Sequence, residues 1–133
     1  MWVKDLNNVT VLAQSDAIEI DTNCLGSLYA EMGAARADAV VCTALEDIAN
    51  GLSLIERSYY RGDAAGVTTA AKTLAGVARK IGLFELAQVA SSVVSLTQSS
   101  DQPALAASLA RLVRMGDRSL TAIWEVQDLN GAV

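Results

Sequence analysis

The sequence predicts an all-α protein, an up-and-down antiparallel four-helix bundle with an N-terminal extension. Of the 133 residues, 52% are apolar and 23 are alanine, whereas aromatic residues make up 5% and proline occurs once. This composition favours packed helices, because Ala and Leu cost least in a helix interior. Four apolar stripes with helical spacing follow one another, joined by the short links typical of antiparallel helices. A chain of this length favours one domain.

The N-terminal extension, residues 1–22, differs from the rest of the chain. It holds two short β-prone runs, residues 9–12 and 17–20. They could pair as a small hairpin, but an isolated two-stranded hairpin is only marginally stable. We therefore expect an arm that lies on the bundle, with the small hairpin as the alternative. The helical domain is expected to cover residues 23–133.

A short helix is expected directly after this extension. Asp21, Thr22 and Asn23 are residue types that cap helix N-termini through their side-chain oxygens. The helix is expected to run through Glu31. Gly33 then provides a plausible end, because glycine is preferred just past a helix.

The four bundle helices are predicted from apolar residues that recur every three or four positions. The first three stripes are Val41, Leu45, Ile48, Leu52, Ile55 and Tyr59; then Val67, Ala71, Leu74, Ala78 and Ile81; then Leu86, Val89, Val93 and Leu96. The fourth opens with Leu105, Leu109 and Leu112 and extends to Leu120, Ile123 and Trp124. Gly116 lies within this last stripe, where the helix could bend or stop.

Turn residues separate the stripes. Residues 61–63 end the first bundle helix, and Asp63 can cap the second. Gly82 ends the second helix, and residues 99–103 form a turn with an early-helix proline at Pro103. Each link is short enough to bring consecutive helices back alongside each other.

The charge balance excludes several classes of partner. Ten basic and fifteen acidic residues give a net charge of −5. An acidic protein repels phosphate backbones, so we expect no nucleic-acid partner. No stretch approaches the ~20 apolar residues that span a bilayer, so we expect no membrane insertion. The N-terminus lacks the apolar run of a signal peptide, and the chain is expected to be soluble and cytoplasmic.

The sequence offers no set of residues for catalysis, metal binding or a cofactor. The chain contains no histidine and two cysteines, Cys24 and Cys42, without a Cys-x-x-Cys motif. Nucleophile–histidine pairs are therefore absent, as are the glycine-rich phosphate-binding patterns. We expect both cysteines to be structural and reduced, and we expect neither a cofactor nor an enzymatic activity.

One segment, residues 71–82, carries a pattern of its own. Counting from Lys72, leucine follows at the second position, glycine at the fourth, a small residue at the sixth, and an apolar–glycine pair at the ninth and tenth. The residues concerned are Leu74, Gly76, Ala78, Ile81 and Gly82, followed by Leu86 at the start of the next helix. This pattern resembles the core motif of histidine-phosphotransfer (HPt) domains, and the resemblance covers roughly residues 36–126. It implies a four-helix bundle in two-component signalling, with a receiver domain of a response regulator or a histidine kinase as partner.

The chain departs from the HPt pattern at the two positions that matter most for phosphate transfer. Lys72 stands where the family has its phosphate-accepting histidine, and Ala75 replaces a lysine that supports the phosphoryl charge. A lysine side chain is protonated at neutral pH and is then no nucleophile. The resemblance therefore implies an HPt-like signalling protein that binds without transferring phosphate.

The candidate partner-binding face surrounds the position that is equivalent to the phospho-histidine. It consists of Thr68, Thr69, Lys72, Ala75, Gly76, Arg79 and Lys80. Positions 72, 75, 76 and 79 share one helix face, and most of them point away from the core stripe. Glycine in a helix interior costs about 0.5–1 kcal/mol relative to alanine, so Gly76 calls for a reason. Either a partner approaches the backbone there, or a neighbouring helix of the bundle does; Lys72 alone could be an ordinary solvated lysine.

Two classes of function therefore remain open. The first is a non-catalytic HPt-like signalling protein. The second is a structural or assembly bundle, possibly a homodimer, that kept only the HPt scaffold. The N-terminal arm and the apolar stretch at residues 122–124 favour the second.

Overall fold

The computed structural model describes residues 20–131, and every regular element among them is a helix. The five helices are α2 (Thr22–Met32), α3 (Ala34–Tyr60), α4 (Ala64–Lys80), α5 (Phe84–Thr97) and α6 (Gln102–Gly131). The prediction of an all-helical protein is confirmed for this part of the chain. The predicted arm or hairpin falls mostly on residues 1–19, outside the described residues.

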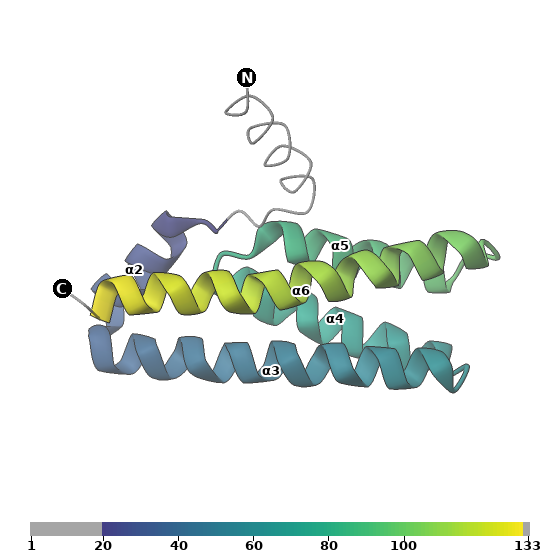
Figure 1. The fold of residues 1–133 in the computed structure, drawn as a ribbon, viewed down its shortest axis with the longest axis horizontal. Coiled ribbons are helices and arrows are strands. Elements are labelled where there is room, and N and C mark those ends of the chain that lie inside the picture. The colour runs from purple at the N-terminus through teal and green to yellow at the C-terminus, as the bar shows by residue number, and fades with distance from the viewer. Residues whose placement is uncertain (1–19, 132–133) are drawn as a thin grey trace, which may run out of the picture.

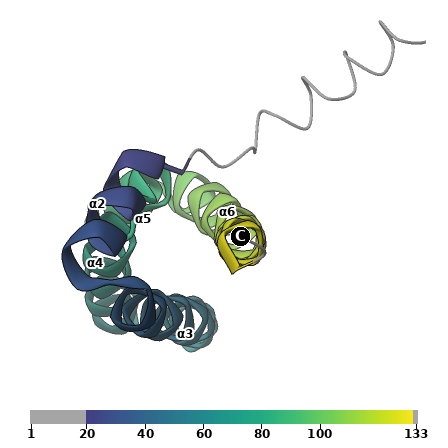
Figure 2. The ribbon, with the colours of Figure 1, turned by 90° about the vertical axis from the view of Figure 1, so that its left-hand side faces the viewer.

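The long helices form a bundle in which neighbours in the chain are neighbours in space. α3 packs on α4, α4 on α5 and α5 on α6, and α6 also contacts α3 (Figure 1). Seen from one end, the four helices follow an arc, with α3 and α6 at its two ends (Figure 2). The α3–α4 and α4–α5 pairs share the most extensive contacts, and the contact between α3 and α6 is smaller.

The helix ends lie where the capping residues predict. The Asp21 carboxylate accepts hydrogen bonds from the backbone N–H groups of Asn23 and Cys24, at 2.9 and 3.1 Å. The Asp63 carboxylate accepts one from the N–H of Gly66 at 2.9 Å, at the start of α4. Gly33 stands between α2 and α3 with a φ of 81°, a backbone conformation that favours glycine.

The core is made by the predicted stripes. The whole second stripe is buried, as are the members of the first stripe from Val41 to Ile55. Tyr59, Leu96 and Leu120 are half-buried and pack against this core. The prediction is wrong for Trp124, which is 58% exposed, although its neighbour Ile123 is fully buried.

Helix α6 runs through Gly116 without a break, and the glycine has a structural reason. A Cβ atom at Gly116 would overlap Leu52 Cδ1 and would lie 3.0 Å from Leu52 Cδ2. Leu52 is itself buried on α3. The missing side chain therefore lets α3 and α6 approach closely at this one level.

Helix α2 is fastened to the turn between α4 and α5. The N–H of Asp21 donates to the Gly82 carbonyl at 3.0 Å, and Cys24 Sγ donates to the Lys80 carbonyl at 3.6 Å. Leu25 adds a buried apolar contact, and α2 packs on α3. α2 therefore covers one end of the bundle. Among residues 20–131, no helix combines the length and the apolar character that crossing a membrane requires.

Candidate functional site

The outer surface of α4 carries most of the residues that the HPt resemblance singles out. Lys72, Thr69, Arg79 and Lys80 are exposed, and Thr68 is half-buried. α4 lies between α3 and α5 in the bundle and has no comparable contact with α6. No other described helix packs on its remaining side to a similar extent, so within residues 20–131 these side chains lie on one accessible face.

Ala75 does not belong to that face. It is 3% exposed and lies in the hydrophobic core with Leu74 and Ala78. α4 packs against a helix on each flank, so its buried arc is wider than the stripe that the sequence shows. The surface around Lys72, here called the α4 face, therefore consists of Thr68, Thr69, Lys72, Gly76, Arg79 and Lys80.

Gly76 is the unusual residue of the α4 face. It is exposed, and a Cβ atom placed on it would meet no heavy atom within 4 Å. No neighbouring helix among residues 20–131 therefore requires a glycine there, and the alternative of a close helix contact inside the bundle is wrong. The cost of glycine at this position, about 0.5–1 kcal/mol, is not offset by packing within the described part of the molecule.

The other motif glycine, Gly82, is explained by the fold. Its φ is 82°, and a Cβ atom there would lie 2.9 Å from the Asp21 carbonyl oxygen and 3.2 Å from Cys24 Cβ. Gly82 thus serves the turn after α4 and the close approach of α2. Of the two glycines in the HPt-like pattern, Gly82 is therefore required by the fold, whereas no packing contact within the described residues requires Gly76.

Polar contacts join the α4 face to α5. Arg79 Nη2 donates to Ser91 Oγ at 3.2 Å, and the hydroxyl oxygens of Thr68 and Thr97 lie 2.8 Å apart. The candidate site therefore extends over two helices. Sequence reasoning missed Ser91 and Thr97, because no spacing within either helix reveals which residues meet across the α4–α5 pair.

The α4 face is basic within an acidic protein. α4 contains Lys72, Arg79 and Lys80 and no acidic residue, whereas the whole chain has a net charge of −5. Arg79 and Lys80 also stand in the last turn, where cations interact favourably with the helix dipole. Lys72, which lies two turns earlier, gains little from that effect.

The chemistry available on the α4 face is that of binding. Its functional groups are two hydroxyls, two exposed lysine side chains, a guanidinium and the exposed helix backbone at Gly76. Within residues 20–131, no three His, Cys, Asp or Glu side chains gather in a way that could hold a metal ion. An acidic protein surface is the natural complement of this arrangement.

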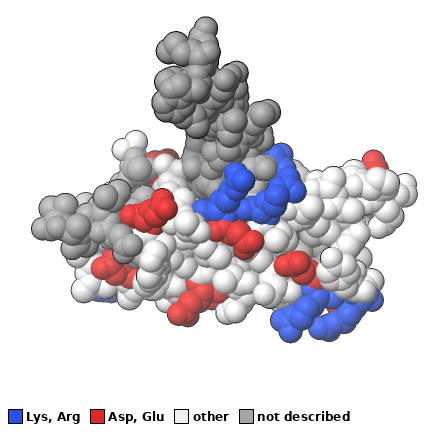
Figure 3. Space-filling model, viewed as in Figure 1, with Lys and Arg blue, Asp and Glu red and all other residues white. Residues whose placement is uncertain are grey.

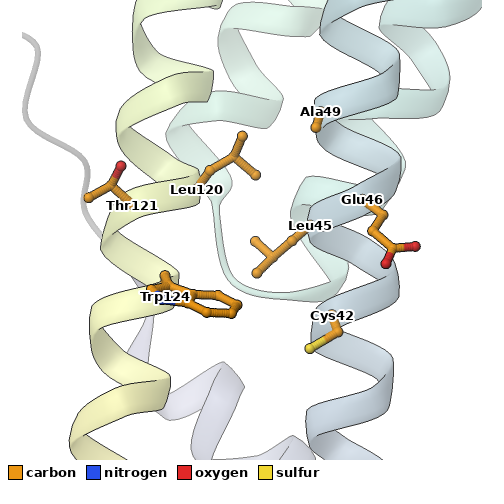
Figure 4. Close-up of a pocket in the computed structure, with 7 residues that line it drawn as sticks. All are labelled: Cys42, Leu45, Glu46, Ala49, Leu120, Thr121 and Trp124. Carbon is orange, nitrogen blue, oxygen red and sulfur yellow. The ribbon is translucent and has the colours of Figure 1, made fainter.

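A second region with functional potential lies on the opposite side of the bundle, between α3 and α6. A hollow of about 650 Å³ opens there (Figure 4), lined by Cys42, Leu45, Glu46, Ala49, Leu120, Thr121 and Trp124. We call it the α3–α6 groove. The sequence singled out residues 122–124 as an apolar stretch, but of these only Trp124 lines the groove, and the α3 contribution was missed.

A further hollow of about 400 Å³ lies beyond Gly116 along the same helix pair, lined by Glu56, Tyr59, Tyr60, Ala106, Leu109, Ala110, Val113 and Arg114. α3 and α6 therefore approach closely at Gly116 and leave space on either side. Basic side chains gather over the middle of α6 and over the end of α3, with acidic ones between and beside them (Figure 3).

No family model matches the chain, and neither a curated protein nor a solved structure does.

Proposed function

We propose that this protein is a non-catalytic, HPt-like signalling protein that binds a receiver domain of a response regulator, or a histidine kinase, through its α4 face without transferring phosphate. In this proposal α3 to α6 correspond to the up-and-down antiparallel four-helix bundle of HPt domains. Lys72 then occupies the place of the phosphate-accepting histidine.

The observation that carries the proposal is the open space around Gly76 on the surface of α4. This glycine lies four residues after Lys72 on an exposed helix face, and nothing within 4 Å would oppose a side chain there. The cost of glycine in a helix interior, about 0.5–1 kcal/mol, would be offset if a partner approached the helix backbone closely at this position. A docked protein domain would make use of the vacant surface and would explain the glycine.

Charge supports the same partner class. Receiver domains present an acidic cluster, and Lys72 and Arg79 provide positive charge on either side of Gly76. Complementary charge speeds association and fixes orientation more than it raises affinity. Lys72 would then bind the acidic cluster as an ion pair, a role that needs no proton transfer.

The test is a binding titration against a panel of receiver domains from the same genome, unphosphorylated and beryllofluoride-activated. The decisive variants are Lys72→Glu and Gly76→Leu. Arg111→Glu and Ala107→Leu, at exposed positions of α6, are the matched controls because they introduce the same charge reversal and a similar added bulk elsewhere. A loss of ~1.4 kcal/mol of binding free energy raises the Kd about tenfold.

We expect saturable binding to at least one receiver domain that both α4 variants weaken about tenfold or more and that both α6 controls leave unchanged. Binding that tolerates Lys72→Glu and Gly76→Leu would remove the α4 face from the interaction. The absence of binding across the whole panel would contradict the signalling role itself.

The second candidate function is a structural or assembly bundle, possibly a homodimer. The observation that favours it is the exposure of large apolar side chains on α3, where Leu54 is 44% and Tyr60 is 82% exposed. Exposed apolar groups of this size are frequent at protein–protein interfaces. A concentration-dependent mass in sedimentation equilibrium, reduced by Leu54→Lys and Tyr60→Lys, is the expected result; a monomer at all concentrations contradicts it.

A further inference from the structure

The α3–α6 groove has an apolar floor between two helices. Cys42 and Leu45 extend from α3 toward α6, and Leu120 and Trp124 extend from α6 toward α3 (Figure 4). Trp124 is exposed although it stands among these apolar side chains. A large ring in this position gains much from burial at little entropic cost. The groove therefore favours an occupant with an apolar body.

The groove is short, and it is bounded at one end. Its α3 side consists of residues 42–49 and its α6 side of residues 120–124, which correspond to about 10 Å and about 6 Å of helix. One turn farther along the pair, a Cβ atom at Gly116 would overlap Leu52, so the two helices leave no room for even a methyl group there.

These dimensions favour a small molecule as the occupant. The hollow of about 650 Å³ falls within the range of small-molecule pockets, roughly 300–1,000 Å³. A groove-binding helix places its anchors at positions i, i+4 and i+7, which span about 10 Å, more than the α6 side of the groove provides. The occupant that fits is therefore a compact organic molecule and not a helix of a partner protein.

The charged groups at the groove are mostly carboxylates. Glu46 is the one charged residue among the described residues that line the groove. The neighbouring hollow shares Thr121 with it and is also lined by Asp117, Arg118 and Glu125. Three carboxylates and one guanidinium thus line the two hollows, in a protein with a net charge of −5. This balance attracts a cation and repels an anion.

The groove also offers specific interactions to an organic cation. The face of an indole ring attracts a cation, and Trp124 provides such a ring on α6. Glu46 provides a carboxylate on α3, so the two groups stand on opposite sides of the hollow. The hydroxyl of Thr121 can accept a hydrogen bond from an ammonium group.

We propose that the α3–α6 groove is a binding site for a small organic cation, an amine with a bulky apolar body. The apolar body lies against Leu45, Leu120 and Trp124, and the ammonium group lies at the edge of the hollow on the side of Glu46. The site is separate from the α4 face and does not depend on receiver binding, so each proposal can fail without the other.

The test compares three probes of one shape that differ in charge. They are 1-adamantylmethylamine, which is a cation at pH 7, the neutral 1-adamantylmethanol and the anion 1-adamantylacetate. Isothermal titration calorimetry of the full-length chain gives a Kd for each probe. We expect saturable binding of the amine about fivefold tighter than that of the alcohol, because an exposed ion pair and a cation–π contact each contribute modestly. The carboxylate should bind most weakly.

Two variants locate the bound amine. Glu46→Gln should remove about half of the advantage of the amine over the alcohol and leave the Kd of the alcohol unchanged. Ala49→Phe places a ring in the hollow and should weaken both probes about tenfold. The matched controls are Glu56→Gln and Ser53→Phe, which make the same changes at exposed positions of α3 that do not line the groove. Both controls should leave all three Kd values unchanged, and circular dichroism verifies that every variant retains its helices.

Three outcomes would overturn the proposal. The absence of saturable amine binding would remove the site. Equal affinity for the amine, the alcohol and the carboxylate would contradict the preference for a cation. Amine binding that tolerates Glu46→Gln and Ala49→Phe but is weakened by Glu56→Gln would assign the amine to the hollow beyond Gly116, which Glu56 lines.

Discussion

Gly76 in α4 and Gly116 in α6 are the same residue in the same secondary structure, yet their surroundings are opposite. A side chain at Gly116 would overlap Leu52, whereas a side chain at Gly76 would meet nothing within 4 Å. Gly116 is buried where two helices cross closely, and Gly76 is exposed on the open side of α4. At Gly116, close helix packing offsets the cost of glycine in a helix. At Gly76, no contact within the described residues offsets that cost.

This comparison separates a residue that serves the fold from one that is available for function. A sequence motif treats both glycines alike, because spacing does not show what a side chain would meet. Substitutions that add volume distinguish them directly. Their effects on the free energy of unfolding should differ in sign as well as in size.

The largest effect is expected from Gly116→Leu. The added side chain must displace the buried Leu52, and overpacking of this kind lowers the free energy of unfolding by about 3 kcal/mol. Gly76→Leu is the matched control and should raise stability slightly, because leucine is the better helix former. Urea unfolding measures both. Similar losses for the two variants would mean that the α4 face is packed in solution.

A smaller loss is expected from Gly82→Ala. Its positive φ and its contact with the Asp21 carbonyl together should cost about 2 kcal/mol, of which about 1 kcal/mol is backbone strain. Gly62→Ala is the control, because Gly62 has a φ of 74° and would meet no atom within 4 Å. Urea unfolding gives both values, and the difference isolates the contact with α2. Equal losses would contradict that contact.

The close approach of α3 and α6 can be tested further by enlarging the side chain at position 116 while shortening the side chain at position 52. Gly116→Ala and Leu52→Val should each destabilise, whereas the double variant should recover about 1 kcal/mol relative to their sum. The reason is that the new methyl group occupies space that the shortened Leu52 vacates. A double-mutant cycle by urea unfolding measures this coupling. Strict additivity would show that the two residues do not share one site.

Much of the fold could be predicted from the sequence, because its determinants are local. The apolar spacing of α3 and α4 predicts their buried faces, and the caps Asp21 and Asp63 act where their residue types indicate. Gly82 ends α4 as expected. Each of these features depends on residues within a few positions of one another, so a single sequence suffices to recognise it.

The features that the sequence did not reveal depend on how helices meet. Ala75 is buried because α4 is packed on two sides, which no periodicity within α4 can show. Trp124 continues an apolar stripe and is nevertheless exposed, where it lines the hollow between α3 and α6. The α3–α6 groove and the Arg79–Ser91 contact likewise join segments that are distant in the sequence or lie on separate helices.

The smallest effect, and the most informative for function, is expected from Gly76→Ala. Because the added methyl group meets no neighbour, the variant should be more stable by about 0.5–1 kcal/mol, the difference in helix propensity between the two residues. Gly26→Ala is the control, because Gly26 also lies in a helix interior with open space around it. Urea unfolding measures the gain in stability, and titration with a receiver domain measures the effect on binding.

If the α4 face docks a partner, Gly76→Ala should stabilise the free protein and weaken binding, whereas Gly26→Ala should stabilise the free protein and leave binding unchanged. A gain in stability at both positions without loss of binding would place Gly76 outside the interface, because a glycine that costs stability and contributes nothing to binding has no role on that face.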